Sequence, residues 1–316
     1  MKKKNLAIGT CIAGAGIAAT ALATAGAICY KTACVSIKEK PPETDPKRIF
    51  RTEIRKKNNA FLFEHNPEDI EILTEKNMRL RAWFVPSEKE SRKFIICVHG
   101  HNCNGPDECG HLFSFYHYDM GYNYLLPDLR GHGRSDGNLI GFGSWDSLDI
   151  KRWIDYLINR FGEDIEIALH GISMGAATVM LVNNTSPRKQ VKAIIEDCGF
   201  TNALDEVAEV CKGMNLKHTS GIIAKAANVY CNIFSKYDLK KDANPLATMK
   251  NAKNPVLFIH GEKDMLVPFE MCGKLYDACP APKEIFTVPD AEHAYCYYDA
   301  KEEYDAKVKE FLGKYM

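Results

Sequence analysis

The sequence predicts an α/β fold in which helices cover both faces of a doubly wound, mostly parallel sheet. Three observations lead to this prediction. Short apolar runs alternate with helical stretches along most of the 316 residues. The runs are mostly apolar throughout, as expected of parallel strands buried on both faces. One of them, Ile165 to Leu169, leads directly into a Gly-x-Ser-x-Gly motif and a stretch of small, helix-forming residues.

The N-terminal segment differs in composition from the rest of the chain. A basic cluster, Lys2 to Lys4, precedes a stretch from Asn5 to Tyr30 that has no charged residue. About 20 apolar residues suffice to cross a bilayer as a helix. We therefore predict that residues 1–30 form a hydrophobic helix that anchors the protein in the cell membrane as a single pass, with a cleaved secretory signal as the alternative.

A linker is predicted after this segment. The run Pro41 to Pro46 is polar and stiffened by its prolines, so we assign residues 31–46 to a linker. The globular domain is expected to cover residues 47–316.

The first strands of the domain are predicted to form a hairpin at a sheet edge. Ile70 to Leu73 and Leu80 to Val85 alternate in polarity and flank the turn-like residues Glu75 to Asn77. Parallel strands are predicted at Phe94–Val98, Tyr122–Leu126, Ile165–Leu169, Val191–Ile195, Pro255–Ile259 and Glu284–Val288. Helices are predicted near His111–Asp119, Ser144–Arg160, Gly175–Asn183, Glu270–Ala278 and Lys301–Tyr315.

One segment interrupts this alternation. Residues 201–250 are mostly helical in character and lie between two predicted strands. We interpret this insertion as a small helical cap that folds over the carboxyl ends of the strands and shapes a substrate pocket. An extra helical layer away from the site is the alternative.

The Gly-x-Ser-x-Gly motif predicts a nucleophile elbow. Ser173 stands at a sharp turn from strand to helix, and Gly171 and Gly175 lie two residues before and after it. A Cβ at either glycine would clash, because the turn brings the strand and helix backbones together. We expect the Met174 N–H, at the start of the helix, to stabilise negative charge that forms on a substrate.

A serine nucleophile needs a base, and the base needs a carboxylate that orients it. We predict His293, in the loop after the last strand, as the base, and Asp264, after the preceding strand, as the carboxylate. The competing acids are Glu262, which lies closer to its strand, and Asp290 and Glu292, which flank the histidine too closely in sequence to reach its ring. His170 and His260 end buried strands and are interpreted as structural.

A second backbone donor is expected in the loop after the first parallel strand. His101 is predicted to supply this oxyanion-hole amide, with Asn102 as the alternative, and His99 is predicted to brace the loop.

These motifs resemble the α/β-hydrolase superfamily, in particular the bacterial serine hydrolases grouped with serine aminopeptidases, monoacylglycerol lipases and small esterases. They occur in the family's order and cover the chain from about residue 60 onward: His99–His101, Asp128–Ser135, the elbow at Ser173, His260–Asp264 and Glu292–Ala294. The resemblance implies the α/β-hydrolase fold and a catalytic triad of Ser173, Asp264 and His293. It also implies that Asp128 to Ser135 form a structural loop rather than part of the triad.

Composition narrows the function further. The 41 basic and 41 acidic residues are spread along the chain, so no basic surface for nucleic acid is expected. The twelve cysteines show no disulfide or zinc spacing. We predict a serine hydrolase that needs no metal or cofactor and cleaves a carboxylic ester of modest size, because the cap carries apolar residues suited to an acyl group. A peptidase or thioesterase of the same fold is the alternative, and a membrane-tethered binding module without catalysis is a third possibility.

Overall fold

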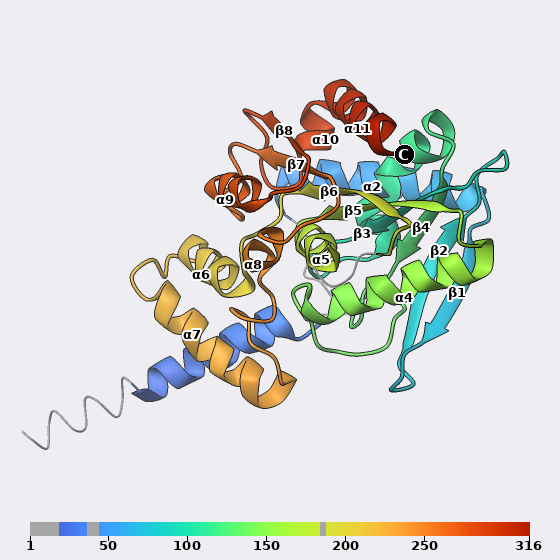
Figure 1. Cartoon of the computed structure of the whole chain (residues 1–316). Helices are drawn as coiled ribbons and strands as arrows, with labels where there is room; N and C mark the ends of the chain where they lie inside the picture. Colours follow the sequence, from blue (N-terminus) through green and yellow to red (C-terminus); the bar gives the residue numbers. More distant parts are fainter. Residues whose placement is uncertain (1–18, 37–43, 184–187) are drawn as a thin grey trace, which may run out of the picture.

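An eight-stranded sheet forms the centre of the molecule in the computed structural model, which describes residues 19–36, 44–183 and 188–316 (Figure 1). The strand order is β1-β2-β4-β3-β5-β6-β7-β8. β1 and β2 pair antiparallel and β2 pairs antiparallel with β4, whereas all pairs from β4 to β8 are parallel. The strands are β1 (Glu68–Leu73), β2 (Arg79–Val85), β3 (Lys93–Val98), β4 (Asn123–Pro127), β5 (Glu166–Ile172), β6 (Val191–Asp197), β7 (Val256–Gly261) and β8 (Lys283–Val288).

Two hydrophobic cores lie on opposite faces of this sheet. In β3, Phe94 and Ile96 belong to one core, and Ile95 and Cys97 to the other, because successive side chains of a strand point to opposite faces. The first core is covered by α4 (Ser144–Phe161), α5 (Met174–Val182), α8 (Pro245–Met249) and α9 (Glu270–Ala278). The second is covered by α2 (Pro46–Glu64), α3 (Gly105–Cys109), α10 (Cys296–Asp299) and α11 (Lys301–Tyr315). The predicted doubly wound arrangement is confirmed.

The predicted hairpin and parallel strands are present, with ends within three residues of those expected; the largest difference is at β5, which ends at Ile172 and not at Leu169. Two helical regions differ from the prediction. Residues His111–Asp119 form no regular α-helix but a 3₁₀ turn, η1 (Gly110–Leu112), and a π-helical turn, η2 (Phe115–Asp119). The 19-residue helix α2 was not predicted; it begins at Pro46, at the end of the proline-rich stretch.

The helical insertion follows β6. It contains α6 (Ala203–Gly213), α7 (Ser220–Tyr230), η3 (Cys231–Ser235) and α8, and the chain then enters β7. α6 and α7 pack against each other to one side of the sheet (Figure 1).

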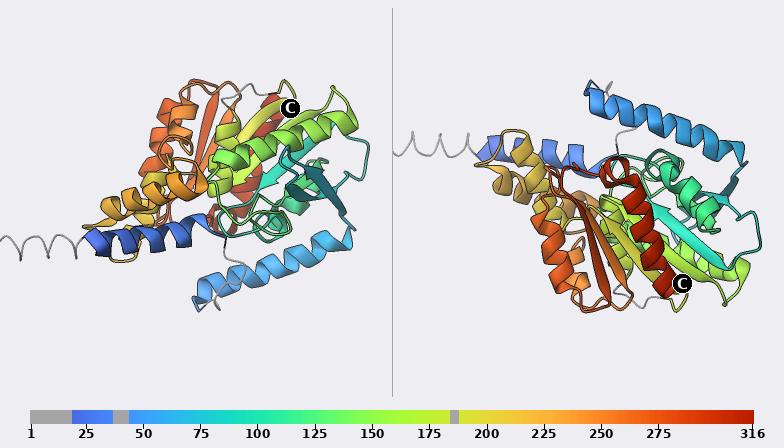
Figure 2. Two further views of the ribbon diagram at one scale, coloured as in Figure 1. Left: turned by 90° about the horizontal axis from the view of Figure 1, so that it is seen from below. Right: turned by 90° about the horizontal axis from the view of Figure 1, so that it is seen from above.

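Residues 19–34 form a helix that lies alongside α6 and α7 in all views (Figures 1 and 2). Helix 19–34 and α7 approach closely: a Cβ built on Gly26 would lie 2.6 Å from the Cβ of Ala226 in α7. The Tyr30 hydroxyl lies 2.9 Å from Ser235 Oγ, and Cys34 Sγ lies 3.2 Å from Cys231 Sγ. This helix is therefore packed onto the insertion.

The predicted membrane anchor is only partly within the described residues, since residues 1–18 lie outside them. Of the helices that are described, none combines the length and the apolar character needed to span a bilayer. The helix continues to residue 34, beyond the predicted end of the segment at residue 30. Residues 37–43 of the predicted linker are also outside the described part of the chain.

Candidate active site

Ser173 stands at the junction of β5 and α5, in a backbone conformation that residues other than glycine rarely adopt. Its φ is 57° and its ψ is −117°. A Cβ on Gly171 would lie 2.1 Å from Gly175 O, and one on Gly175 would lie 2.0 Å from Val98 O. No side chain fits at either position, as the sequence predicted. The Ser173 N–H donates to Asp197 O at 2.8 Å, which fixes the turn to the end of β6.

The structure brings Ser173, His293 and Asp264 into one hydrogen-bonded line. His293 Nε2 lies 2.9 Å from Ser173 Oγ, and His293 Nδ1 lies 2.7 Å from Asp264 Oδ2. The three residues follow β5, β8 and β7, so they meet at the carboxyl ends of parallel strands. This is the geometry that a serine nucleophile, its base and an orienting carboxylate require.

Asp264 is held as a carboxylate by its surroundings. Oδ1 accepts hydrogen bonds from the backbone N–H groups of Leu266 at 2.9 Å and Val267 at 2.8 Å. Burial alone would raise the pKa of Asp264, but the hydrogen bonds and positive charge of His260 and His293 lower it below its usual value. An ionised Asp264 can stabilise a protonated His293.

A second histidine touches Asp264 from the other side. His260 Nε2 donates to Val267 O at 2.9 Å and lies 3.4 Å from Asp264 Oδ2. Although burial lowers the pKa of His260, the hydrogen bond to Asp264 and the charge of Glu196 raise it overall. The sequence reasoning treated His260 as structural; its position four residues before Asp264 was the available signal for this contact.

The competing acids lie elsewhere. Glu262 is exposed and accepts a hydrogen bond from Thr287 Oγ1 at 2.8 Å. Asp290 is exposed and forms an ion pair with Lys263, and Glu292 is also exposed. Glu262 and Asp290 thus have partners of their own, and the acid that contacts His293 Nδ1 is Asp264.

The predicted oxyanion-hole residues His101 and Met174 line the same cavity as Ser173. The alternative, Asn102, uses its N–H for a hydrogen bond of 3.1 Å to His132 Nε2, which leaves His101 as the better candidate. His99 is fully buried, and its Nε2 accepts a hydrogen bond from Leu129 N at 2.9 Å. His99 thus ties the oxyanion loop to the loop after β4.

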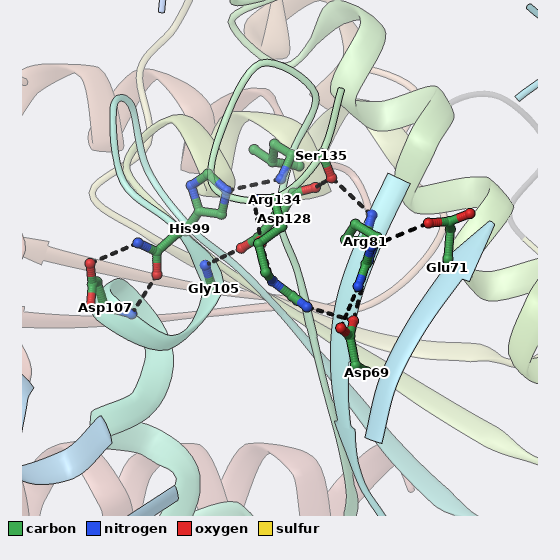
Figure 3. Close-up of polar contacts among 11 residues, drawn as sticks. Asp69, Glu71, Arg81, His99, Gly105, Asp107, Asp128, Arg134 and Ser135 are labelled. Atoms are coloured by element: carbon green, nitrogen blue, oxygen red, sulfur yellow. Dashed lines mark hydrogen bonds and ion pairs between the residues drawn. The ribbon is translucent and has the colours of Figure 1, made fainter. Parts of the chain in front are cut away.

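Asp128 organises that second loop, which is the Asp128–Ser135 motif (Figure 3). Its carboxylate accepts from Gly105 N and from Arg134 N, each at 3.0 Å, while its carbonyl accepts from Ser135 Oγ at 2.6 Å. Arg134 continues the network to Asp69 in β1. These contacts join the loop to α3 and the sheet edge and give it a structural role.

A cavity of about 480 Å³ opens above Ser173. Its walls are mostly apolar and come from three parts of the chain. Helix 19–34 contributes Ala25, Ile28, Cys29, Thr32 and Ala33; the insertion contributes Glu206, Val207, Val210, Cys211, Met214, Leu216 and Ile223; loops near the sheet contribute Phe142, Phe200 and Leu266. The sequence did not predict that the N-terminal segment would form a wall of the site, nor that Glu206 would lie inside it.

One group of possible metal ligands occurs within the described residues, and it overlaps this site. Cys198, Asp264 and His293 lie close together. His293 is already bonded to both Asp264 and Ser173, and burial raises the pKa of the Cys198 thiol well above its usual value. With both ring nitrogens of His293 engaged by Asp264 and Ser173, the group fits the hydrogen-bonded line better than a metal site.

Comparisons with known proteins support the fold and the family. The model of the prolyl oligopeptidase family matches residues 111–316. YqkD of Bacillus subtilis, described only as an uncharacterized protein, is 28% identical over 74% of this chain and 75% of its own. The lysophosphatidylserine lipase ABHD12 of Danio rerio is 26% identical over 64% of this chain and 51% of its own. The esterase Pf2001 of Pyrococcus furiosus has the same fold, with a TM-score of 0.68 and 23% identity over 90% of this chain and 98% of its own.

Proposed function

The chain belongs to the prolyl oligopeptidase family, and from that premise we propose that it is a serine hydrolase that cleaves a carboxylic ester of modest size. The observation that carries the proposal is the hydrogen-bonded line from Asp264 through His293 to Ser173, placed at the base of an apolar cavity. A cavity with mostly aliphatic and aromatic walls suits an acyl group better than a charged one.

The reaction proceeds by acyl transfer in two halves. Ser173 Oγ attacks the ester carbonyl while His293 Nε2 takes its proton, and Asp264 stabilises the resulting imidazolium. The N–H groups of Met174 and His101 bind the oxyanion. His293 then gives the proton to the leaving alcohol. In the second half, His293 takes a proton from water, which attacks the acyl-enzyme, and then returns a proton to Ser173 Oγ as the acid is released.

The insertion and the N-terminal helix hold the acyl group. Residues 201–250 act as the cap, and helix 19–34 completes the cavity wall on the side of α6 and α7. Membrane anchoring through residues 1–30 stays a prediction, and residues 19–30 of that segment pack on the insertion and line the cavity. Fractionation of cells that express the full chain tests this part: release by salt or carbonate in place of detergent would count against an anchor.

A peptidase is the second candidate. The family description favours it, and Glu206 is an acidic side chain in the cavity that an amino terminus could pair with. Ester and amide substrates separate the two candidates.

The test uses the full chain with p-nitrophenyl esters from acetate to palmitate and aminoacyl p-nitroanilides. An esterase turns over the esters with an optimum at intermediate acyl length and leaves the anilides nearly unchanged. Preference for the anilides would favour the peptidase. Turnover of neither by a folded protein would favour a binding module that lacks catalysis.

A further inference from the structure

Among the described residues that line the cavity, Glu206 is the one acidic side chain. It lies on α6, one turn into the helix, and only 6% of its surface is exposed. Its Oε2 atom is buried and has no hydrogen-bond partner among the described residues. A buried polar atom without a partner costs folding free energy, so such an atom next to a reaction site requires an explanation.

The surroundings of Glu206 disfavour a negative charge. Val207, Val210 and Ile223 are apolar neighbours in the cavity wall. Burial, followed by the negative charges of Asp264 and Glu209, raises the pKa of Glu206 well above its usual value. The other titratable groups in the cavity wall are His101, Cys29 and Cys211. These surroundings favour the neutral acid form of Glu206, and a neutral carboxylic acid has one O–H donor.

We propose that Glu206 is a specificity-determining residue that donates a hydrogen bond to an oxygen atom on the acyl group in the cavity. The preferred substrate is then an ester whose acyl chain carries a keto or hydroxyl oxygen. This inference rests on the proposed function, because it assumes that the acyl group occupies the cavity. It goes beyond that function because it names the chemical class of the substrate and the residue that recognises it.

An oxygen acceptor fits better than an ammonium group. A cation would have to lose its water in a cavity whose walls are mostly apolar, and one carboxylate would be its main compensation. A keto or hydroxyl oxygen loses far less hydration and satisfies the orphaned donor directly. An ammonium ligand is retained as an outcome of the test.

Binding to a chain that cannot turn over its ligand tests the inference independently of catalysis. The full chain with Ser173→Ala is compared with the double variants that add Glu206→Gln or Glu206→Leu. Ligands are methyl octanoate, its analogues with one keto oxygen at successive carbons, and the analogue with a terminal amine. Calorimetry gives the dissociation constants, and thermal melting confirms that each variant is folded. Gln keeps a hydrogen-bond donor without any charge, whereas Leu keeps the approximate volume without a donor.

We expect at least one keto analogue to bind about 3- to 10-fold more tightly than methyl octanoate when Glu206 or Gln is present, the range for one neutral hydrogen bond. Leu should abolish this preference, so that the keto analogue and methyl octanoate bind equally well. A preference that survives in the Leu variant overturns the inference. Tighter binding of the amine that is lost in both Gln and Leu also overturns it, since it assigns Glu206 to a cation. Ester turnover by the unmodified chain is measured separately and reports on the proposed function alone.

Discussion

Asp264 is the residue on which the polar groups of the site converge. Two backbone N–H groups and His293 bond to it, and His260 lies against it. Because the site lies in a buried region, each of these contacts favours the carboxylate form and fixes its direction toward His293. His260 is thus a positioning residue, since it reaches the reacting atoms only through Asp264.

The change His260→Gln is predicted to lower kcat about 10-fold and to leave KM nearly unchanged. Gln can still donate to Val267 O, but it loses the ring contact that helps to keep Asp264 ionised, and a hydrogen bond to a charged group is worth about 1.5 kcal/mol or more. Steady-state kinetics with a p-nitrophenyl ester measures the effect.

His170→Gln is the matched control for that change. His170 also lies in a buried strand, but its ring nitrogens lie within hydrogen-bond distance of the hydroxyls of Tyr116 at 2.7 Å and Tyr304 at 3.0 Å. Its loss should lower the melting temperature without lowering kcat of the folded enzyme. Equal effects of both substitutions on kcat would reject the positioning role of His260.

At this scale the sequence predicts the residues that local backbone geometry demands. Ser173, Gly171 and Gly175 are recognisable because the tight turn excludes other residues, and Asp264 and His293 follow from their places after strands. Glu206 could not be placed, because an acidic residue on a helix usually faces water and only the packing of α6 turns it inward.

Among the elements, helix 19–34 has the largest consequence for the site. It supplies Ala25, Ile28, Cys29, Thr32 and Ala33 to the cavity and packs on the insertion through Gly26. The uncharged sequence of this segment predicts a membrane helix and gives no sign of a contact with the domain, since packing against α7 and packing in lipid call for the same apolar and small residues. α2 was not predicted because its sequence is strongly basic and polar. It packs on the domain through ion pairs of Arg51 and Arg55 with the buried Glu108.

Gly26→Ala is predicted to destabilise the contact between the two helices. The added Cβ would lie 2.6 Å from Ala226 Cβ, so the helix must shift, at a cost of about 1 to 3 kcal/mol. The cavity wall would shift with it. Thermal melting and KM for an octanoate ester measure the two effects, and both should worsen.

Gly221→Ala, in α7, provides the comparison. A Cβ at Gly221 meets nothing within 4 Å, and Ala favours the helix by up to about 1 kcal/mol. This variant should be as stable as the original or more so, with KM unchanged. If Gly26→Ala behaved in the same way, helix 19–34 would not be packed on the insertion.

Over the whole molecule, buried carboxyl groups at the carboxyl end of β6 and in α3 set the pH dependence of stability. Burial raises the pKa of Glu196 to about 8 and that of Asp197 to about 6. Burial alone would also raise the pKa of Glu108, but the charges of Arg55 and Arg51 lower it to about 2. The first two groups stabilise the fold only while they are protonated, and Glu108 stabilises it only while it is ionised.

The free energy of unfolding is therefore predicted to be largest in mildly acidic solution. As pH rises from the usual Glu value of 4.5 toward about 8, the unfolded chain releases the proton that folded Glu196 still holds, so stability falls by up to about 1.4 kcal/mol per pH unit. His260, whose pKa is also raised, adds to this fall. Below pH 4.5 the free energy of unfolding falls as the solution becomes more acidic, because Glu108 takes up a proton and loses its stabilising charge.

Urea unfolding from about pH 4 to about pH 9 measures the part of this curve in which Glu196, Asp197 and His260 titrate. Glu196→Gln should flatten the alkaline side, because an amide has no proton to release. An unchanged slope in that variant would show that Glu196 does not govern it.

The overall architecture was largely predictable, because runs of buried strands separated by helices have few ways to form a sheet with right-handed connections. The arrangement of the N-terminal helix was not, because it depends on a contact between residues about 200 positions apart, such as Tyr30 with Ser235. This contact also decides which protein should be tested: a chain that begins at Lys47 would lack the five cavity residues of helix 19–34.

The central claim is that Ser173 is an activated nucleophile, and labelling with a fluorophosphonate tests it most directly. The full chain is treated with the probe, and mass spectrometry locates the adduct. We predict a single phosphonylated residue, Ser173, with no label in Ser173→Ala and strongly reduced labelling in His293→Gln. A folded chain that stays unlabelled, or label that persists in the Ser173→Ala variant, would contradict the claim.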